Sequence, residues 1–193
     1  MVSFPISERD FSHLITVANW NELVQGVNLL AGGGRLSTDT VKYVIKTNTQ
    51  TSSVAGAGSV EISGLTISHA VSKVGNSVLI LGLVHTYGGF EIGFIAPAIN
   101  GTVLANMTGD AAGGRARVHA AAQIRQVDRI FPLPILARYE PPSTASVTYS
   151  VRALNGSVSA QTTYVNRSSG DADDSLRPRG VSTLCIIEIE DVS

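Results

Sequence analysis

Short runs in which apolar and polar residues alternate recur about every ten residues over most of the chain. An alternation of period two is typical of a β-strand with one buried face. The runs predict strands at Val60–Ile67, Ser77–His85, Gly89–Ile95, Thr102–Asn106, Arg115–Gln123, Ala145–Ala153, Val158–Asn166 and Val181–Ile189. Glycines and Asn-Gly pairs separate them, and Asn155-Gly156 between two runs is a strong hairpin signal. About eight short strands at this spacing favour a mainly β chain, an antiparallel jelly-roll β-sandwich.

The last run, Val181–Ile189, carries apolar side chains on both of its faces. One face holds Val181, Thr183, Cys185, Ile187 and Ile189, and the other holds Ser182, Leu184, Ile186, Glu188 and Glu190. We therefore expect the second face to be partly covered as well as the first. A strand made last must pair with strands made much earlier. We expect this closing strand to lie inside a sheet rather than at its edge.

An amphipathic helix is predicted ahead of the strands. Apolar residues at three- and four-residue spacing run from Val17 through Trp20 to Leu30, and Gly32-Gly33-Gly34 ends the pattern. A single helix of this length cannot bury its own apolar stripe. It must pack on the β domain, on copies of itself or on a larger partner. We therefore divide the chain into a helical anchor segment, residues 1–35, and a β domain, residues 36–193.

The segment Arg129–Pro142 interrupts the strand pattern with four prolines in eleven residues. Proline cannot donate to a β ladder, so we expect no central strand over most of this segment. One interpretation is an extended apolar connection that covers one end of the sandwich or a neighbouring subunit. The other is an ordinary loop with buried side chains.

The composition favours an assembled protein. Charged residues make up 15% of the chain, against about a quarter in typical domains. A surface with few charges indicates burial in an assembly, or else a polar surface rich in Ser, Thr and Asn. The net charge of −1 gives no field that would attract nucleic acid. The sequence start shows no signal-peptide pattern, the apolar run Val78–Val84 is too short to span a membrane, and Cys185 is expected to be a buried free thiol.

The sequence offers no catalytic set. The four histidines, at 13, 69, 85 and 119, lie in no catalytic motif, and neither a metal-ligand spacing nor a P-loop is present. Asp171, Asp173 and Asp174 could bind Ca²⁺, but we favour solvation or pairing with Arg177 and Arg179. We therefore expect no enzyme activity, no cofactor and no metal. The alternative from another class is a carbohydrate-active β-sandwich enzyme or lectin, for which Glu61, Glu91 and Asp110 are the carboxylates to test.

Several stretches together resemble a family of virion proteins. Thr16–Leu30 is similar to the short N-terminal helix of many tailed-phage structural proteins. Gly109–Val118, Tyr164–Ser168, Pro178–Leu184 and the closing Ile187-Glu188-Ile189 resemble virion proteins of aquatic and cyanobacterial phages. The resemblance covers most of residues 16–190. It implies a trimeric jelly-roll domain of the C1q/tumour-necrosis-factor kind on a phage particle, where members are capsid decoration proteins or tail fibre tips.

The resulting hypothesis is a non-enzymatic homotrimer, assembled in the host cytoplasm into a virion as a capsid decoration or cement protein or a short tail-fibre protein. Its partners would be copies of itself and other virion proteins, with no nucleic acid and no membrane insertion. The expected anchoring residues are Phe4, Phe11, Trp20, Leu23, Val27 and Leu30. The alternative is a receptor- or glycan-binding tail-fibre tip. Its contact loops would carry Asp110, Asp171, Asp173, Asp174, Arg177 and Arg179, with Tyr87 and Tyr139 as loop aromatics.

Overall fold

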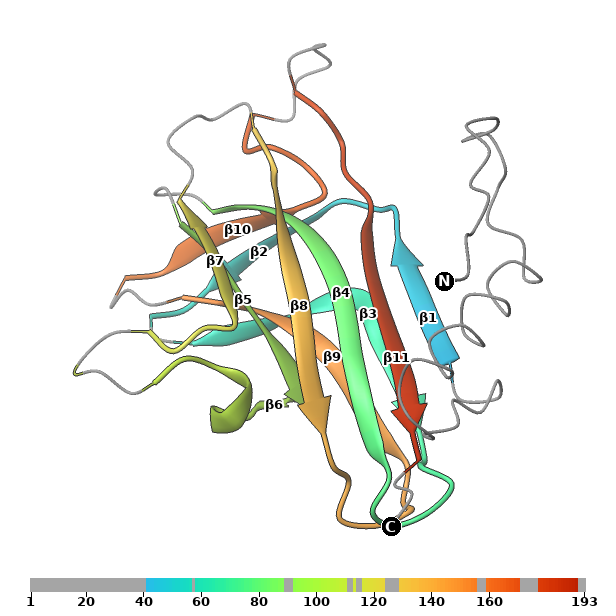
Figure 1. The fold of residues 1–193 in the computed structure, drawn as a ribbon. Coiled ribbons are helices and arrows are strands. Elements are labelled where there is room, and N and C mark those ends of the chain that lie inside the picture. The colour runs from blue at the N-terminus through green and yellow to red at the C-terminus, as the bar shows by residue number, and fades with distance from the viewer. Residues whose placement is uncertain are drawn as a thin grey trace, which may run out of the picture.

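The computed structural model describes residues 41–56, 58–88, 92–110, 113, 116–123, 129–155, 159–170 and 177–190. These residues form two antiparallel sheets (Figure 1). The larger sheet contains β1 (Val41–Lys46), β2 (Gln50–Val54), β4 (Ser77–Gly88), β8 (Phe131–Tyr139), β10 (Gln161–Val165) and β11 (Ser182–Ile189). The smaller contains β3 (Ser59–His69), β5 (Ile92–Ile99), β6 (Thr102–Val103), β7 (Ala120–Gln123) and β9 (Val147–Leu154). The prediction of a mainly β, antiparallel chain is confirmed.

β4 is the central strand of the larger sheet. Its residues 77–83 pair with β11 and its residues 86–88 pair with β10, while β8 pairs along 78–86. β1 pairs with β11 and β2 pairs with β10. One margin of this sheet is therefore formed by β1 and β2 in succession, and the opposite margin is formed by β8. In the smaller sheet β9 lies between β3 and β5, and β5 also pairs with β6 and β7.

The core lies between the two sheets. Its fully buried side chains come from both, and the largest include Ile62, Leu65, Ile80, Val84, Ile95, Tyr149, Leu184 and Ile186. Burying an aliphatic side chain of this size contributes about 1.5–3 kcal/mol. The sandwich is therefore held mainly by apolar burial between the sheets.

The closing strand β11 lies between β1 and β4, as predicted. Its inward face carries Leu184 and Ile186, both fully buried. Its outward face carries Cys185 and Ile187, which are half-buried. The expectation of a buried Cys185 thiol is therefore wrong, because the thiol lies on the outward face of the sheet.

The proline segment forms a strand, β8, over Phe131–Tyr139, but at a margin of the sheet. The expectation of no central strand there is therefore confirmed, although neither the connection nor the loop interpretation included this strand. The physical reason is the direction of the proline nitrogens. The Leu136 amide donates to His119 Nε2, away from β4, and backbone directions alternate along a strand. Pro132 and Pro134 lie four and two residues before Leu136, so their nitrogens also point away from β4. Neither proline therefore removes a ladder bond to β4. Because β8 is a margin strand, it tolerates them.

Other boundaries differ from the predictions. β1 and β2 were not predicted, since the stretch up to Ser53 reads as polar. The predicted strand at Thr102–Asn106 stops at Val103 and is followed by a 3₁₀ turn, Ala105–Met107. The predicted strand at Arg115–Gln123 begins only at Ala120. The Asn100-Gly101 turn is a hairpin connection, with positive φ at both residues. The hairpin expected at Asn155-Gly156 is wrong, because β9 and β10 lie in different sheets.

The helical anchor, residues 1–35, lies outside the described residues. Its expected anchoring residues, Phe4, Phe11, Trp20, Leu23, Val27 and Leu30, lie outside them too.

Candidate functional site

The outward surface of the larger sheet is apolar over four strand positions. The strand register brings its side chains into rows that cross the sheet. Tyr43, Cys185, Leu81 and Leu136 form one row, and Ile45, Thr183, Leu83 and Pro134 form the next. Ile187 and Leu79 extend the surface beyond the first row. We call these ten residues the outer face.

The orientation of β1 is the reverse of that in an ordinary surface strand. Tyr43 and Ile45 point outward and are 70% and 56% exposed. Lys46 is instead buried, and burial lowers the pKa of its ammonium group. The Lys42 ammonium reaches the opposite sheet and donates to the Ser68 carbonyl oxygen at 2.9 Å. A margin strand in water normally presents its lysines outward. This strand presents its apolar side chains instead, which makes the outer face a candidate for contact with another surface.

The outward surface of the smaller sheet has the opposite character. Ser59, Glu61, Thr66, Ser68, Thr148 and Arg152 lie on it, according to the register of β3 and β9. The Arg152 guanidinium donates to Ser59 Oγ at 2.8 Å and to the Ser59 carbonyl oxygen at 3.0 Å. These side chains suit contact with water. The two outward surfaces therefore differ in polarity, and the apolar one is the candidate for binding.

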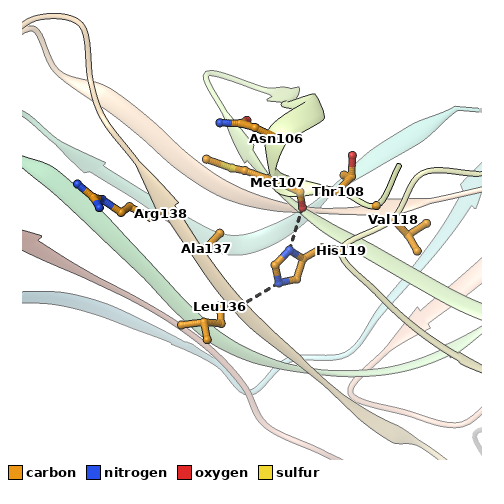
Figure 2. A pocket seen from close by; sticks show the side chains of 9 residues that line it. Asn106, Met107, Thr108, Val118, His119, Leu136, Ala137 and Arg138 are labelled. Atoms are coloured by element: carbon orange, nitrogen blue, oxygen red, sulfur yellow. Dashed lines mark hydrogen bonds between the residues drawn. The ribbon is translucent and has the colours of Figure 1, made fainter. Parts of the chain in front are cut away.

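A pocket of about 370 Å³ lies beside the β8 margin (Figure 2). The 3₁₀ turn and the residues that follow it, His119 ahead of β7, and β8 form its walls. His119 joins these parts. Its Nε2 accepts from the Leu136 amide at 3.1 Å, so the proton lies on Nδ1, which donates to the Met107 carbonyl oxygen at 2.9 Å. This geometry requires a neutral imidazole.

A buried polar cluster joins His69, Ser72 and Asn76 to Glu188. One carboxylate oxygen of Glu188 lies 2.8 Å from His69 Nε2, and the other accepts from the Ser72 amide and hydroxyl and from Asn76 Nδ2. Burial acts to raise the pKa of Glu188, but the hydrogen bonds from Asn76, Ser72 and His69 outweigh burial and lower it. The cluster contains Ser, His and a carboxylate, yet the Ser72 hydroxyl donates to the acid rather than to the imidazole. It therefore lacks the order of a nucleophilic triad.

Asn166, within the Tyr164–Ser168 motif, is a second buried hub. It has a φ of 60° and no exposed surface. Its Nδ2 donates to the Lys46 and Asn48 carbonyl oxygens, and its Oδ1 accepts from the Ser182 hydroxyl. Its backbone amide donates to the His85 carbonyl oxygen at 2.8 Å. One side chain thus joins β10, the link between β1 and β2, and the start of β11.

The predicted contact residues lie in two separate loops. Asp110 is exposed in the loop that follows the 3₁₀ turn. Arg177 and Arg179 lie in the segment that leads into β11, where the Arg177 guanidinium donates to the Gly170 carbonyl oxygen. Figure 1 shows these two regions at different places on the sandwich. Asp171, Asp173 and Asp174 lie outside the described residues, as does Glu91.

The expectation that Tyr87 and Tyr139 are loop aromatics is wrong. Tyr87 belongs to β4 and is 6% exposed, with its ring 5.8 Å from that of Tyr164. Tyr139 ends β8 and packs edge-on against the buried Tyr149 ring at 6.2 Å. Because both rings are engaged inside the fold, neither provides a stacking platform for a glycan on a loop.

Within the described ranges, no group of three or more His, Cys, Asp or Glu side chains could hold a metal ion. In the same part of the chain, no helix has the length and hydropathy needed to cross a membrane. No protein-family model matches the sequence, and no match was found among curated proteins. Among the described residues, the exposed apolar side chains of the outer face favour a binding role.

Proposed function

We propose that this chain is a non-enzymatic structural protein of a phage virion that assembles as a homotrimer through its outer face. The observation that carries the proposal is the reversed β1, which exposes Tyr43 and Ile45 and buries Lys46. Water does not stabilise this arrangement, whereas a second apolar surface does. Copies of the same chain are the simplest source of that surface.

We infer further that the sandwich is a jelly roll, from its nested pairing. Leaving aside β2, β6 and β10, eight strands remain in chain order: β1, β3, β4, β5, β7, β8, β9 and β11. The first of these pairs with the last, the second with the seventh, the third with the sixth, and the fourth with the fifth. This is the pairing of a long hairpin rolled up into two sheets, which describes a jelly roll. It supports the resemblance to trimeric jelly-roll proteins.

The size of the outer face makes it a marginal interface by itself. Four strand positions about 4.8 Å apart, with some five residues of about 3.4 Å each, cover roughly 330 Å². Covering that area contributes about 8 kcal/mol per copy at about 25 cal/mol per Å². The cost of association is about 4–15 kcal/mol, so the outer face alone is marginal. The anchor segment, residues 1–35, would add contacts to the particle.

The place in a virion rests on the resemblance and on the low content of charged residues, 15%. The roles that we propose are capsid decoration or cement protein, or short tail-fibre protein. A glycan-binding tip is less well supported, because Tyr87 and Tyr139 pack inside the fold.

Light scattering on a sizing column tests the trimer. The expected mass is three times the chain mass of 20.2 kDa. Ile45→Glu places a charge on the β1 margin of the outer face and should give a folded monomer. The matched control is Val74→Glu, because Val74 is 58% exposed but lies in the loop between β3 and β4, off the outer face. A monomeric wild type overturns the proposal, and a trimeric Ile45→Glu shows that the outer face is not the interface.

The anchor is tested separately. Removing residues 1–35 should leave a folded trimer that no longer joins the particle. A truncated chain that still incorporates contradicts the anchoring role.

A further inference from the structure

We infer that the two margins of the outer face bind each other between neighbouring copies, with Tyr43 of one copy entering the pocket beside Leu136 of the next. This inference rests on the proposed function. It specifies a head-to-tail contact, in which each copy uses two different surfaces. The β1 margin of one copy, which carries Tyr43, contacts the β8 margin of the next, which carries the pocket. Such a contact is required for a closed ring of three.

The first argument is the position of the two patches. Tyr43 lies on β1 at one margin of the larger sheet, and Leu136 lies on β8 at the other. Three strand spacings of about 4.8 Å separate them, roughly 14 Å. Tyr43 therefore cannot reach the pocket of its own chain, but it can reach the same pocket on a second copy.

The second argument is the level of the two patches along the strands. Tyr43 pairs with Cys185, Cys185 with Leu81, and Leu81 with Leu136, so all four share one row. Rotation about an axis parallel to the strands keeps both ends of a row at the same height. Repeating the contact then closes a ring without translation along the axis, whereas patches at different heights would generate an open filament.

The third argument is chemical. Tyr43 is 70% exposed, and tyrosine combines a large apolar ring with a polar tip, the combination that is enriched at the centres of interfaces. The pocket offers both kinds of partner. Met107, Val118 and Leu136 supply apolar wall, and Thr108 and Arg138 supply hydrogen-bonding groups. Figure 2 shows these side chains around the opening above β8.

The fourth argument is that the pocket wall is fixed before binding. His119 holds the 3₁₀ turn to β8 through the Met107 carbonyl oxygen and the Leu136 amide. Met107 is 4% exposed, so this wall is anchored in the core. A preformed site costs less ordering on binding than a loop that must fold around its partner.

Thiol cross-linking tests the contact directly. On a Cys185→Ser background, which removes the only native thiol, Tyr43→Cys is combined with Asn106→Cys on the exposed rim of the pocket. A short bismaleimide should then yield covalent dimers and trimers on a denaturing gel. Tyr43→Cys combined with Lys73→Cys, on the exposed loop between β3 and β4, is the matched control and should yield none.

The solution mass of each variant is measured before cross-linking, so that the two proposals fail differently. A mass of three chains with no cross-link between positions 43 and 106 overturns the head-to-tail contact and leaves the proposed trimer standing. Cross-linking of Tyr43→Cys alone into dimers shows a two-fold contact and also overturns it. A wild-type mass of one chain overturns both, whereas a monomeric Tyr43→Cys variant of a trimeric wild type supports the contact through Tyr43. As a second measurement, Tyr43→Ala should weaken trimer formation at least tenfold while the far-ultraviolet spectrum is unchanged.

Discussion

The carboxylate of Glu188 lies 2.8 Å from the imidazole of His69, although 119 residues separate them in the sequence. His69 ends β3 in the smaller sheet, and Glu188 lies near the end of β11 in the larger. The contact therefore joins the two sheets at one end of the sandwich. Ser72 and Asn76 donate to the second carboxylate oxygen and fix the loop that leads into β4.

The first prediction concerns this buried carboxylate. Glu188 is 1% exposed, so Glu188→Ala removes a carboxylate that His69, Ser72 and Asn76 contact inside the fold. We expect the free energy of unfolding to fall by about 3–5 kcal/mol. Urea denaturation at neutral pH measures the loss. Glu190→Ala, which removes an exposed carboxylate from the same end of the chain, is the control and should change little.

A second prediction follows for acid stability. The hydrogen bonds hold the pKa of Glu188 below its ordinary value, so the folded state binds fewer protons than the unfolded state. The stabilisation is complete above the unfolded pKa of about 4.3 and is lost as the pH falls through the lower folded pKa. Wild type should therefore lose stability more steeply below about pH 4 than Glu188→Gln does. Parallel slopes for the two proteins would contradict this assignment.

A third prediction compares two asparagines with positive φ. Asn166→Gly keeps the backbone freedom but removes the hydrogen bonds to Lys46, Asn48 and Ser182 inside the fold. It should cost about 3 kcal/mol, because buried partners are left unsatisfied. Asn100→Gly, at a φ of 50° in an exposed turn, should cost less than about 1 kcal/mol. Equal thermal unfolding temperatures for the two variants would argue against the hub.

The fourth prediction uses Cys185 as a probe of the outer face. The thiol is half-buried on that face, and burial raises its pKa. In the assembled protein a maleimide should react slowly, and in Ile45→Glu it should react several times faster at the same pH. Because the chain has one cysteine, the rate reports this position alone. Equal rates in the two proteins would show that the outer face is uncovered in both.

A fifth prediction tests the backbone direction in β8. Pro134→Thr should change stability by less than about 0.5 kcal/mol, because the nitrogen of residue 134 points away from β4. Ile135→Pro should cost about 3 kcal/mol or more, because the nitrogen of residue 135 points toward β4 and would lose its ladder bond. Chemical denaturation of the pair distinguishes the two. A large loss of stability in Pro134→Thr would mean that the proline ring makes a stabilising contact beyond those described for β8.

The strands that the sequence predicted are those whose inward faces are apolar and outward faces polar, or whose runs are apolar throughout. β3, β4, β9 and β11 belong to these groups. β1 was missed because its two lysines, Lys42 and Lys46, reach inward. The alternation of polar and apolar residues in this strand therefore does not follow the pattern of an ordinary surface strand. β8 was missed because the rule against proline applies to central strands, and only the three-dimensional pairing shows that β8 is a margin strand.

The candidate interface could be predicted only in part. Low charge and the amphipathic helix predicted an assembly, but they do not show which face of a sheet is uncovered, and both faces of β11 are apolar. Leu184 and Ile186 face the core, and Cys185 and Ile187 face outward, a choice that depends on the partner strands. The row from Tyr43 to Leu136 joins four strands distant in sequence, so periodicity within any one strand cannot reveal it.

The pairing of β1 with β11 also has a consequence for synthesis. Val41 pairs with Ile187, so the first described strand waits for almost the whole chain before it gains its neighbour. Contacts between residues so far apart in sequence are slow to form. A ribosome must release the chain through Ile187 before β1 gains this neighbour. The outer face is therefore completed only after β11 has been synthesised, and shorter nascent chains do not yet present it.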